Sequence, residues 1–510
     1  MGVGRTGSLA ALVPPAAPRD SARRARLSPP RPLLFLLLAV AVVGAAWALI
    51  VPPFQSPDEN SHFGYAQEVA EKFELPGDAD RKVFSTEAQL AHDRSNSEQA
   101  AALLESKPEW SRAAYQRWQD ENARLPDSAR SDGGGPNPAT TNPPLYYLYA
   151  APAYVVAKGG DLFDRLYLMR LWSALLLLVT ATGAWLLAGE LFNRNRPLQL
   201  VAAAFAGLQP MVSFLSASLT PDALLYALWS LALWLGVRIL KRGLTLAQGT
   251  ALLAIVALAI VTKASSYALL PASLLALGIG LLRLRRAGSP RVATIAVVAL
   301  LALVVPVGGW LVTARALDRP AVNQVATNTG QQAPGLTSFN VRELGSYLWQ
   351  FYLPRLSFQK QFGGMPDLPV YNVWLKTGWG AFGWLEVKFP PWVYVLLALF
   401  TVAALAGALA FVLRNRAQVD LAVVAFVALV VLTLLAGLHW TEFRTLVGGT
   451  GPFNQGRYLL PLVSLFGAAV AAALALVPER RRAPAIGLVL GGLFALQLFS
   501  LAIVAGRFYA

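Results

Sequence analysis

Long uncharged apolar runs alternate with short polar segments along most of the chain. Each run is about long enough to cross a hydrocarbon core of about 30 Å as a helix. These runs are 33–51, 171–189, 197–219, 244–262, 264–282, 292–314, 391–413, 421–438, 458–478 and 485–506. A shorter run, 223–237, can also span if the Arg238 side chain extends to the membrane surface. The pattern predicts an all-α polytopic membrane protein with about eleven transmembrane helices.

Composition and charge support a membrane protein and argue against a nucleic-acid partner. Hydrophobic residues make up 55% of the 510 residues and charged residues 14%, with a formal net charge of +15. The excess Lys and Arg residues stand at the ends of apolar runs. The clusters are the segment before residue 33, Arg194 and Arg196, Lys241 and Arg242, Arg283 to Arg291, Arg414 and Arg416, and Arg480 to Arg482. One topology places every cluster in the cytoplasm, as the positive-inside rule requires.

This topology predicts the organisation of the chain. Residues 1–32 form a basic cytoplasmic N-terminal segment, and residues 33–510 form a multi-pass transmembrane domain in the plasma (inner) membrane. Two large extracytoplasmic loops follow, the first large loop at 52–164 and the second large loop at 315–390. Residues 144–158 are short and rich in Tyr and Pro, so we interpret them as a re-entrant or interfacial helix.

The stretch VPPFQSPDENSHFGYAQ follows directly on the first apolar run and contains Asp58, Glu59 and His62. One interpretation is a helix start, because Pro57 breaks the incoming chain and acidic residues suit a first helical turn. The alternative is a catalytic site. Asp58 and His62 are neighbours at helical spacing, and a carboxylate in a dry cleft can remove a proton from a hydroxyl. Asp58 and Glu59 could also hold a divalent cation such as Mg or Mn.

Further ionisable groups fall on the same predicted face of the membrane, where charged groups are costly and often functional. Arg170, Lys263 and Arg457 are either cations that extend to the membrane surface or ligands of a phosphate. Asp222 follows a proline and either caps the next helix or belongs to the site.

Aromatic residues crowd the end of the second large loop. Trp379 and Trp384 stand among glycines in the segment WLKTGWGAFGWLEVKFPPW. They are either part of an interfacial aromatic belt or a platform for a sugar ring or a lipid.

At these residues the chain resembles known families. PDENSHFGYAQ resembles the Asp-Glu motif in the first outer loop of protein O-mannosyltransferases. TNPPLYYLYAAPAY is similar to the His-Pro-Pro-Leu-Tyr-Tyr segment of the wider GT-C superfamily of membrane glycosyltransferases, with Asn142 where His is common. MRLWSALLLLVTATGAWLLAGELF resembles the arginine-led helix that follows it. PPFQSPDE, LTPDALL, GWGAFGW and QGRYLLP together resemble most closely a bacterial family of predicted membrane proteins, domain of unknown function 2142.

This resemblance implies a GT-C-like enzyme that takes a hexosyl or pentosyl group from a polyprenyl-phosphate donor. The acceptor would be a cell-envelope glycan, lipid or protein on the extracytoplasmic face. Asp58 would be the general base or a metal-binding carboxylate, Glu59 its neighbour, and Arg170 a ligand of the lipid phosphate. Charge and sidedness add His62, Asp222, Lys263 and Arg457 to the substrate site. The alternatives are a transporter or flippase of lipid-linked sugars, which would more often show two related halves, and a membrane scaffold without activity.

Overall fold

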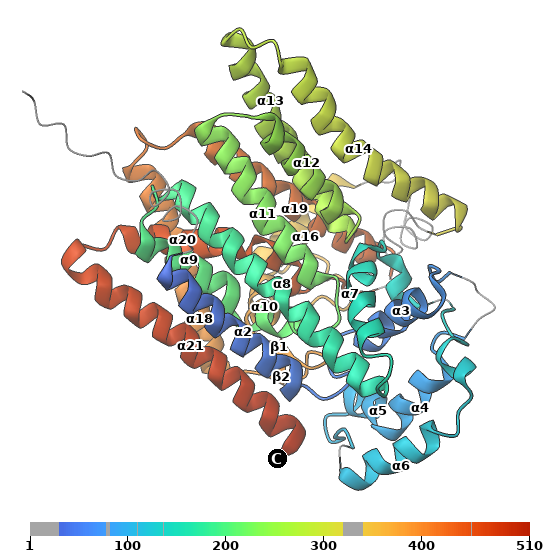
Figure 1. The fold of residues 1–510 in the computed structure, drawn as a ribbon. Coiled ribbons are helices and arrows are strands. Elements are labelled where there is room, and N and C mark those ends of the chain that lie inside the picture. The colour runs from blue at the N-terminus through green and yellow to red at the C-terminus, as the bar shows by residue number, and fades with distance from the viewer. Residues whose placement is uncertain (1–29, 78–81, 110, 136, 320–339, 450) are drawn as a thin grey trace, which may run out of the picture.

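The computed structural model describes residues 30–77, 82–109, 111–135, 137–319, 340–449 and 451–510. Most of the basic segment 1–32 and part of the second large loop, residues 320–339, lie outside the described residues. The described part is a bundle of long helices with shorter elements packed around it (Figure 1).

Nine helices in the described part of the chain are long and apolar enough to cross a membrane, and one bent pair makes a tenth. The nine are α2 (Arg31–Ile50), α8 (Leu162–Leu191), α11 (Asp222–Arg242), η3 with α13 (Ala264–Leu269 and Leu270–Arg286), α14 (Val292–Ala316), α18 (Pro391–Arg414), α19 (Leu421–Val447), η6 with α20 (Gly456–Leu462 and Val463–Ala475) and α21 (Glu479–Tyr509). The prediction of an all-α polytopic membrane protein is confirmed. The expected count of about eleven also includes run 244–262, which forms α12 (Leu246–Ile260), a helix only about 22 Å long.

The bent pair consists of α9 (Arg196–Leu208) and α10 (Pro210–Ser216), whose axes differ by 54°. The break falls at Gln209 and Pro210, because proline has no N–H to continue the helix. The Gln209 side chain restores one lost partner by accepting a hydrogen bond from the Val212 N–H at 2.7 Å. A single predicted run, 197–219, thus becomes two short helices.

Helices α11 and α8 form the centre of the bundle. In its most apolar stretch 83% of α11 is buried, against 61% of α8 and 6% of α18. Small residues allow the backbones to approach closely: a Cβ on Gly467 of α20 would lie 2.5 Å from the Ala202 carbonyl oxygen of α9. Charged side chains in the buried stretches of these helices, such as Arg165 and Arg170 of α8 and Asp222 of α11, are therefore enclosed by protein and need partners inside it.

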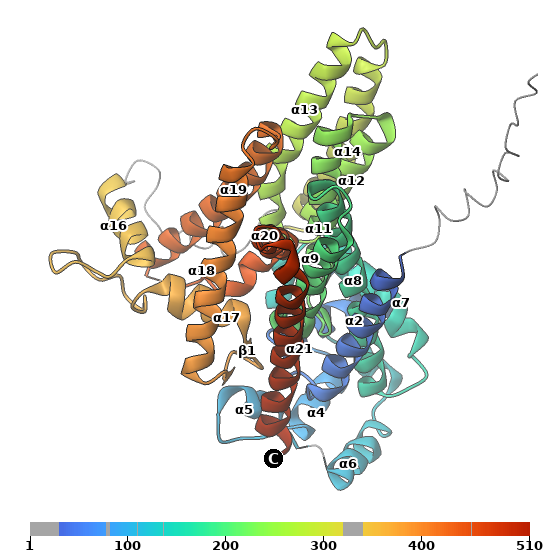
Figure 2. The ribbon, with the colours of Figure 1, turned by 90° about the vertical axis from the view of Figure 1, so that its left-hand side faces the viewer.

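The first large loop folds into short helices at one end of the bundle. They are α3 (Glu59–Lys72), α4 (Thr86–Arg94), α5 (Ser97–Ala102), α6 (Arg112–Asn122), η1 (Asp127–Arg130), η2 (Pro138–Thr141) and α7 (Leu145–Val156). Two views show α4, α5 and α6 at this end and the turn between α13 and α14 at the opposite end (Figures 1 and 2). Helix α7 coincides with the predicted interfacial segment, and at about 18 Å it is shorter than the hydrocarbon core.

The second large loop packs against the same bundle through small elements. These are α16 (Val341–Tyr352), η5 (Val370–Leu375), α17 (Lys376–Trp379) and two short antiparallel strands, β1 (Ala381–Phe382) and β2 (Val387–Lys388). In Figure 2, α16 and α17 lie beside α18 and α19. The indole N–H of Trp384 donates to the Phe54 carbonyl oxygen at 3.1 Å, so the two large loops touch just before Asp58.

Candidate functional site

The chain between α2 and α3 is strained at two positions. Phe54 and Asp58 have φ values of 60° and 59°, in the left-handed region that side chains other than Gly seldom adopt. Asp tolerates this conformation, but Phe does so only when its surroundings impose it. Strain of this kind concentrates at functional sites. Here the Asp58 side chain forms no cap hydrogen bond to α3 and is 47% exposed.

Asp58 faces a cation from the far end of the chain. Nη2 of Arg457, at the start of η6, lies 3.2 Å from Oδ2 of Asp58. Within the described residues, Oδ1 of Asp58 has no hydrogen-bond partner, and Nε of Arg457 is buried without one. The pair therefore keeps one free acceptor and one free donor for a ligand.

A second pair of opposite charges lies next to the first. Nζ of Lys263, between α12 and η3, is 2.5 Å from Oδ1 of the buried Asp222 at the start of α11. The ring of Tyr458 contacts the cation of each pair. Nζ of Lys263 lies 5.5 Å and the guanidinium carbon of Arg457 5.3 Å from the ring centre. The site thus presents two cations and two carboxylates at the ends of membrane helices.

His62 lies against both pairs. Its Nδ1 is 2.8 Å from the Tyr147 hydroxyl. Burial lowers the pKa of His62 from its ordinary 6.5 to about 4; Asp58 and Asp222 raise it, and Lys263 and Arg457 lower it. Four charged groups predicted for the site therefore influence the protonation of His62, whose ring is neutral at physiological pH.

The depressed pKa of His62 predicts a loss of stability in weak acid. Between pH 6.5 and about 4 the unfolded chain binds a proton at His62 that the folded protein does not bind. The free energy of unfolding should therefore fall as the pH falls through this window, by about 1.4 kcal/mol per unit. Thermal melting at pH 7 and pH 5 checks this, and the drop should shrink in His62→Gln. An equal drop in both proteins would contradict it.

Glu59 and Arg170 form a closed pair beside the site. Both side chains are fully buried, and the Arg170 Nε and Nη2 donate to the two carboxylate oxygens of Glu59. The remaining N–H groups of Arg170 donate to the carbonyl oxygens of Ala48, Val51 and Pro52. All five donors are thus bound by protein, and Arg170, expected to contact a lipid phosphate, instead fixes the end of α2 and the start of α3.

The pairing of Glu59 with Arg170 also limits how a metal ion could bind at Asp58 and Glu59. Besides both contacts with Arg170, Glu59 Oε1 accepts the Leu219 N–H at 3.2 Å, so neither carboxylate oxygen is free. Across the described ranges, no three His, Asp or Glu side chains lie close enough together to hold a metal ion. Asp58 is the carboxylate that an incoming cation could reach.

The two tryptophans predicted as a platform have structural partners. Trp379 is 7% exposed and packs against Phe205, Phe400 and Phe466, and its indole N–H donates to Thr401. Trp379 also lines an apolar cavity of about 590 Å³ formed mainly by α18 and α21, so a role toward a lipid stays a prediction. Trp384 is half-buried, and its bond to Phe54 holds the strained segment before Asp58.

Sequence reasoning missed two groups that shape the site. Glu442, in the last turns of α19, accepts the backbone N–H groups of Phe453 and Asn454 at 2.6 and 2.7 Å, just before Arg457. Tyr147 holds His62 and stacks on Tyr65 with ring centres 3.6 Å apart. A lone carboxylate near the end of an apolar run was the available signal for Glu442.

Comparisons with known proteins give matches to solved structures and to one protein family. Among solved structures, the chain is similar to the apo oligosaccharyltransferase of Archaeoglobus fulgidus (12% identity, TM-score 0.44). It is also similar to ArnT from Cupriavidus metallidurans bound to undecaprenyl phosphate (16%, 0.42) and to AglB from Archaeoglobus fulgidus with an inhibitory peptide and a dolichol-phosphate (11%, 0.45). Each alignment covers 93% of this chain, which spans only 56%, 63% and 55% of those chains, respectively.

No curated protein matches the sequence. The family predicted from the sequence motifs is confirmed: residues 41–466 match DUF2142, described as a predicted membrane protein. Because this match covers well over half of the 510 residues, the protein belongs to the DUF2142 family of predicted membrane proteins.

Proposed function

We propose that the protein transfers a sugar from a polyprenyl-phosphate-linked donor to a cell-envelope acceptor. The observation that carries this proposal is the pairing of Asp58 with Arg457 beside Lys263 and Asp222. A carboxylate with a free oxygen and two cations meet at the ends of membrane helices, where a lipid-borne phosphate and a water-borne acceptor can reach the same site. The resemblance of the Asp58 motif to that of protein O-mannosyltransferases supports the same reaction.

The proposed mechanism is a single displacement. The acceptor hydroxyl oxygen attacks the anomeric carbon while Oδ1 of Asp58 removes its proton. The bond from the anomeric carbon to the phosphate oxygen breaks, and its electron pair stays on the leaving phosphate. The fixed positive charges of Arg457 and Lys263 stabilise that phosphate, with Nε of Arg457 as the uncommitted donor. The transferred sugar has the inverted configuration at its anomeric carbon. A product with retained configuration would contradict the mechanism.

Glu59 and Arg170 would serve this reaction by positioning. Their buried pair holds the segment that carries Asp58 against the end of α8. If Mg or Mn binds, Asp58 would hold it and the cation would add positive charge at the leaving phosphate. Among the described residues at this site, only the Asp58 carboxylate is exposed and keeps a free oxygen for such an ion, which is a poor fit to the several oxygen ligands that the ion prefers.

We further propose that the site faces the extracytoplasmic side of the plasma membrane and that the N-terminus is cytoplasmic. The basic turn between α13 and α14 lies at the opposite end of the bundle from α4, α5 and α6 (Figures 1 and 2). Arg283 to Arg291 would then be cytoplasmic, in agreement with the positive-inside rule.

Transfer of radiolabelled sugar by the purified protein tests the proposed function. A panel of hexosyl and pentosyl polyprenyl phosphates is offered with a cell-envelope fraction as acceptor. We expect label to move from at least one donor into the envelope fraction. If no donor supports transfer, but the protein moves a labelled lipid across vesicle membranes, the proposal fails in favour of a transporter or flippase.

Glu442→Ala is expected to lower kcat/KM for transfer by about tenfold or more. The change leaves the N–H groups of Phe453 and Asn454 without an acceptor and releases the segment that places Arg457. Initial transfer rates check this. Glu442→Gln is the matched control, because its amide oxygen can still accept and should keep most of the activity. Equal losses in both variants would contradict a role through these hydrogen bonds.

A further inference from the structure

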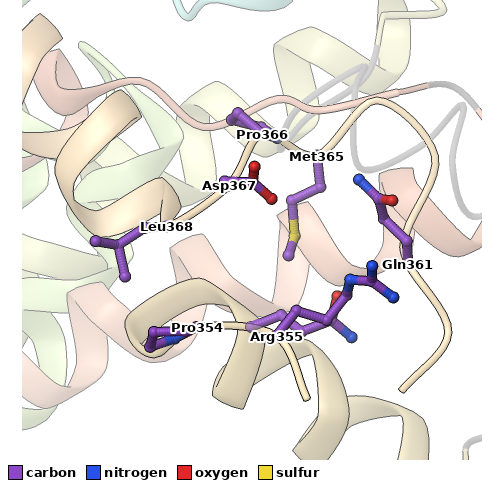
Figure 3. A pocket seen from close by; sticks show the side chains of 8 residues that line it. Pro354, Arg355, Gln361, Met365, Pro366, Asp367 and Leu368 are labelled. Carbon is purple, nitrogen blue, oxygen red and sulfur yellow. The ribbon is translucent and has the colours of Figure 1, made fainter. Parts of the chain in front are cut away.

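A separate cavity of about 300 Å³ lies in the second large loop (Figure 3). Its walls come from the end of α16 and from two loop segments that follow. The lining residues are Gln350, Pro354, Arg355, Gln361, Met365, Pro366, Asp367 and Leu368. None of them belongs to the site around Asp58. The volume is at the lower end of the range for small-molecule sites.

We propose that this cavity binds an uncharged sugar ring of a glycan acceptor. The inference rests on the proposed function, whose acceptor it specifies: a glycan, rather than a lipid or a protein without sugar.

The polar groups of the cavity are largely uncommitted. Arg355 gives one bond, from Nη1 to the Gln359 carbonyl oxygen at 3.0 Å, and no described carboxylate pairs with it. Within the described part of the chain, the side chains of Gln361 and Asp367 form no hydrogen bond or ion pair. Gln350 is 4% exposed and uses both N–H groups on Ser346 and Lys360, which leaves its carbonyl oxygen free.

The free polar groups of the cavity can form hydrogen bonds with the hydroxyl groups of a sugar. Arg355 and Asp367 line one cavity without forming a salt bridge, so a ligand there meets donors and acceptors together (Figure 3). A hydroxyl group both donates and accepts, and several hydroxyls on one ring can satisfy guanidinium, carboxylate and amides at once. One positive and one negative charge give no net attraction for an ionic ligand. Met365 and Leu368 add apolar surface for the C–H groups of a sugar ring.

The cavity adjoins the segment that carries Arg457. Gly364, next to Met365, approaches Pro452 so closely that an added Cβ would lie 3.0 Å from its Cδ. Pro452 precedes the two N–H groups held by Glu442, and Arg457 follows five residues later. Helix α16 is attached to the same helix α19, because the Tyr347 and Tyr352 hydroxyls lie 2.9 and 2.7 Å from the two ring nitrogens of His439. A glycan bound in the cavity would therefore lie next to helix α19 and the segment after Pro452, which together position Arg457.

Binding of the full-length protein to immobilised oligosaccharides tests the inference without need for transfer. The array carries neutral hexose oligosaccharides and acidic ones that contain uronic acids. We expect retention on neutral glycans, weakened about tenfold or more in Asp367→Asn and in Arg355→Gln, because each change removes hydrogen bonds to a charged group. The controls Arg342→Gln and Glu343→Gln change the same charges on exposed positions of α16 outside the cavity and should bind as wild type does.

The outcomes separate this inference from the proposed function. Asp58→Asn should keep glycan binding while losing transfer. If the protein binds neutral glycans through Asp367 and Arg355 but transfers no sugar, the proposed transferase activity is refuted and the cavity is still supported as a glycan-binding site. No retention of any neutral glycan, equal retention by the cavity variants and wild type, or a preference for acidic glycans would each overturn the inference.

Discussion

Asp58→Asn is expected to lower kcat for sugar transfer by about 10²- to 10⁴-fold, the usual contribution of a general base. The amide cannot take the proton of the acceptor hydroxyl, so attack on the anomeric carbon loses its base. Binding of the lipid donor should change little, because Arg457 and Lys263 remain. Initial rates with the labelled donor, together with donor binding by the purified variant, check both parts.

The fold should tolerate this substitution, so lost transfer can be attributed to chemistry. Asn is among the residues that adopt the left-handed conformation of position 58, where φ is 59°. Asp58 is half-exposed, and a salt bridge in such a position contributes little to stability. Asp120→Asn, on the exposed side of α6, is the matched control and should transfer normally. If Asp58→Asn kept more than a tenth of wild-type kcat, another group would have to be the base.

Much of the candidate site was predictable from sequence because membrane helices constrain where their ends lie. Apolar runs and basic clusters together assign each helix end to one face, so Asp58, Asp222, Lys263 and Arg457 were expected at the same level of the membrane. The salt bridges of Arg457 with Asp58 and of Lys263 with Asp222 agree with that expectation. The role of these groups in catalysis stays a prediction.

Sequence could not say which of these charges would pair, since sidedness restricts position along the membrane normal only. Arg170 and Arg457 lie on the same predicted face and had the same predicted role. All N–H groups of Arg170 are bound by Glu59 and backbone carbonyl oxygens, whereas Nε of Arg457 has no hydrogen-bond partner. The difference depends on neighbours more than one hundred residues away. For the same reason, the packing of Trp379 against rings from α9, α18 and α20 has no signal in the segment GWGAFGW.

Arg170→Gln is expected to destabilise the protein by about 3–5 kcal/mol, the usual result of breaking a buried ion pair. The change leaves the Glu59 carboxylate charged in a fully buried position and removes donors from the carbonyl oxygens at the end of α2. Glu59→Gln should cost a similar amount, because it strands the guanidinium instead. Thermal melting in detergent measures both effects, and Arg117→Gln, which removes an exposed salt bridge on α6, should leave the melting temperature nearly unchanged.

This measurement also decides between two roles for Arg170. A phosphate ligand would be dispensable for folding, so Arg170→Gln would melt like wild type and raise KM for the donor. A structural pair predicts the reverse: a large loss of stability in either single variant and a non-additive effect in the double variant, because removing the second charge relieves the first. Lys should not replace Arg170, since a single ammonium group cannot bind both carboxylate oxygens and three carbonyl oxygens at once. The position of Asp58 then depends on a pair that itself touches no substrate.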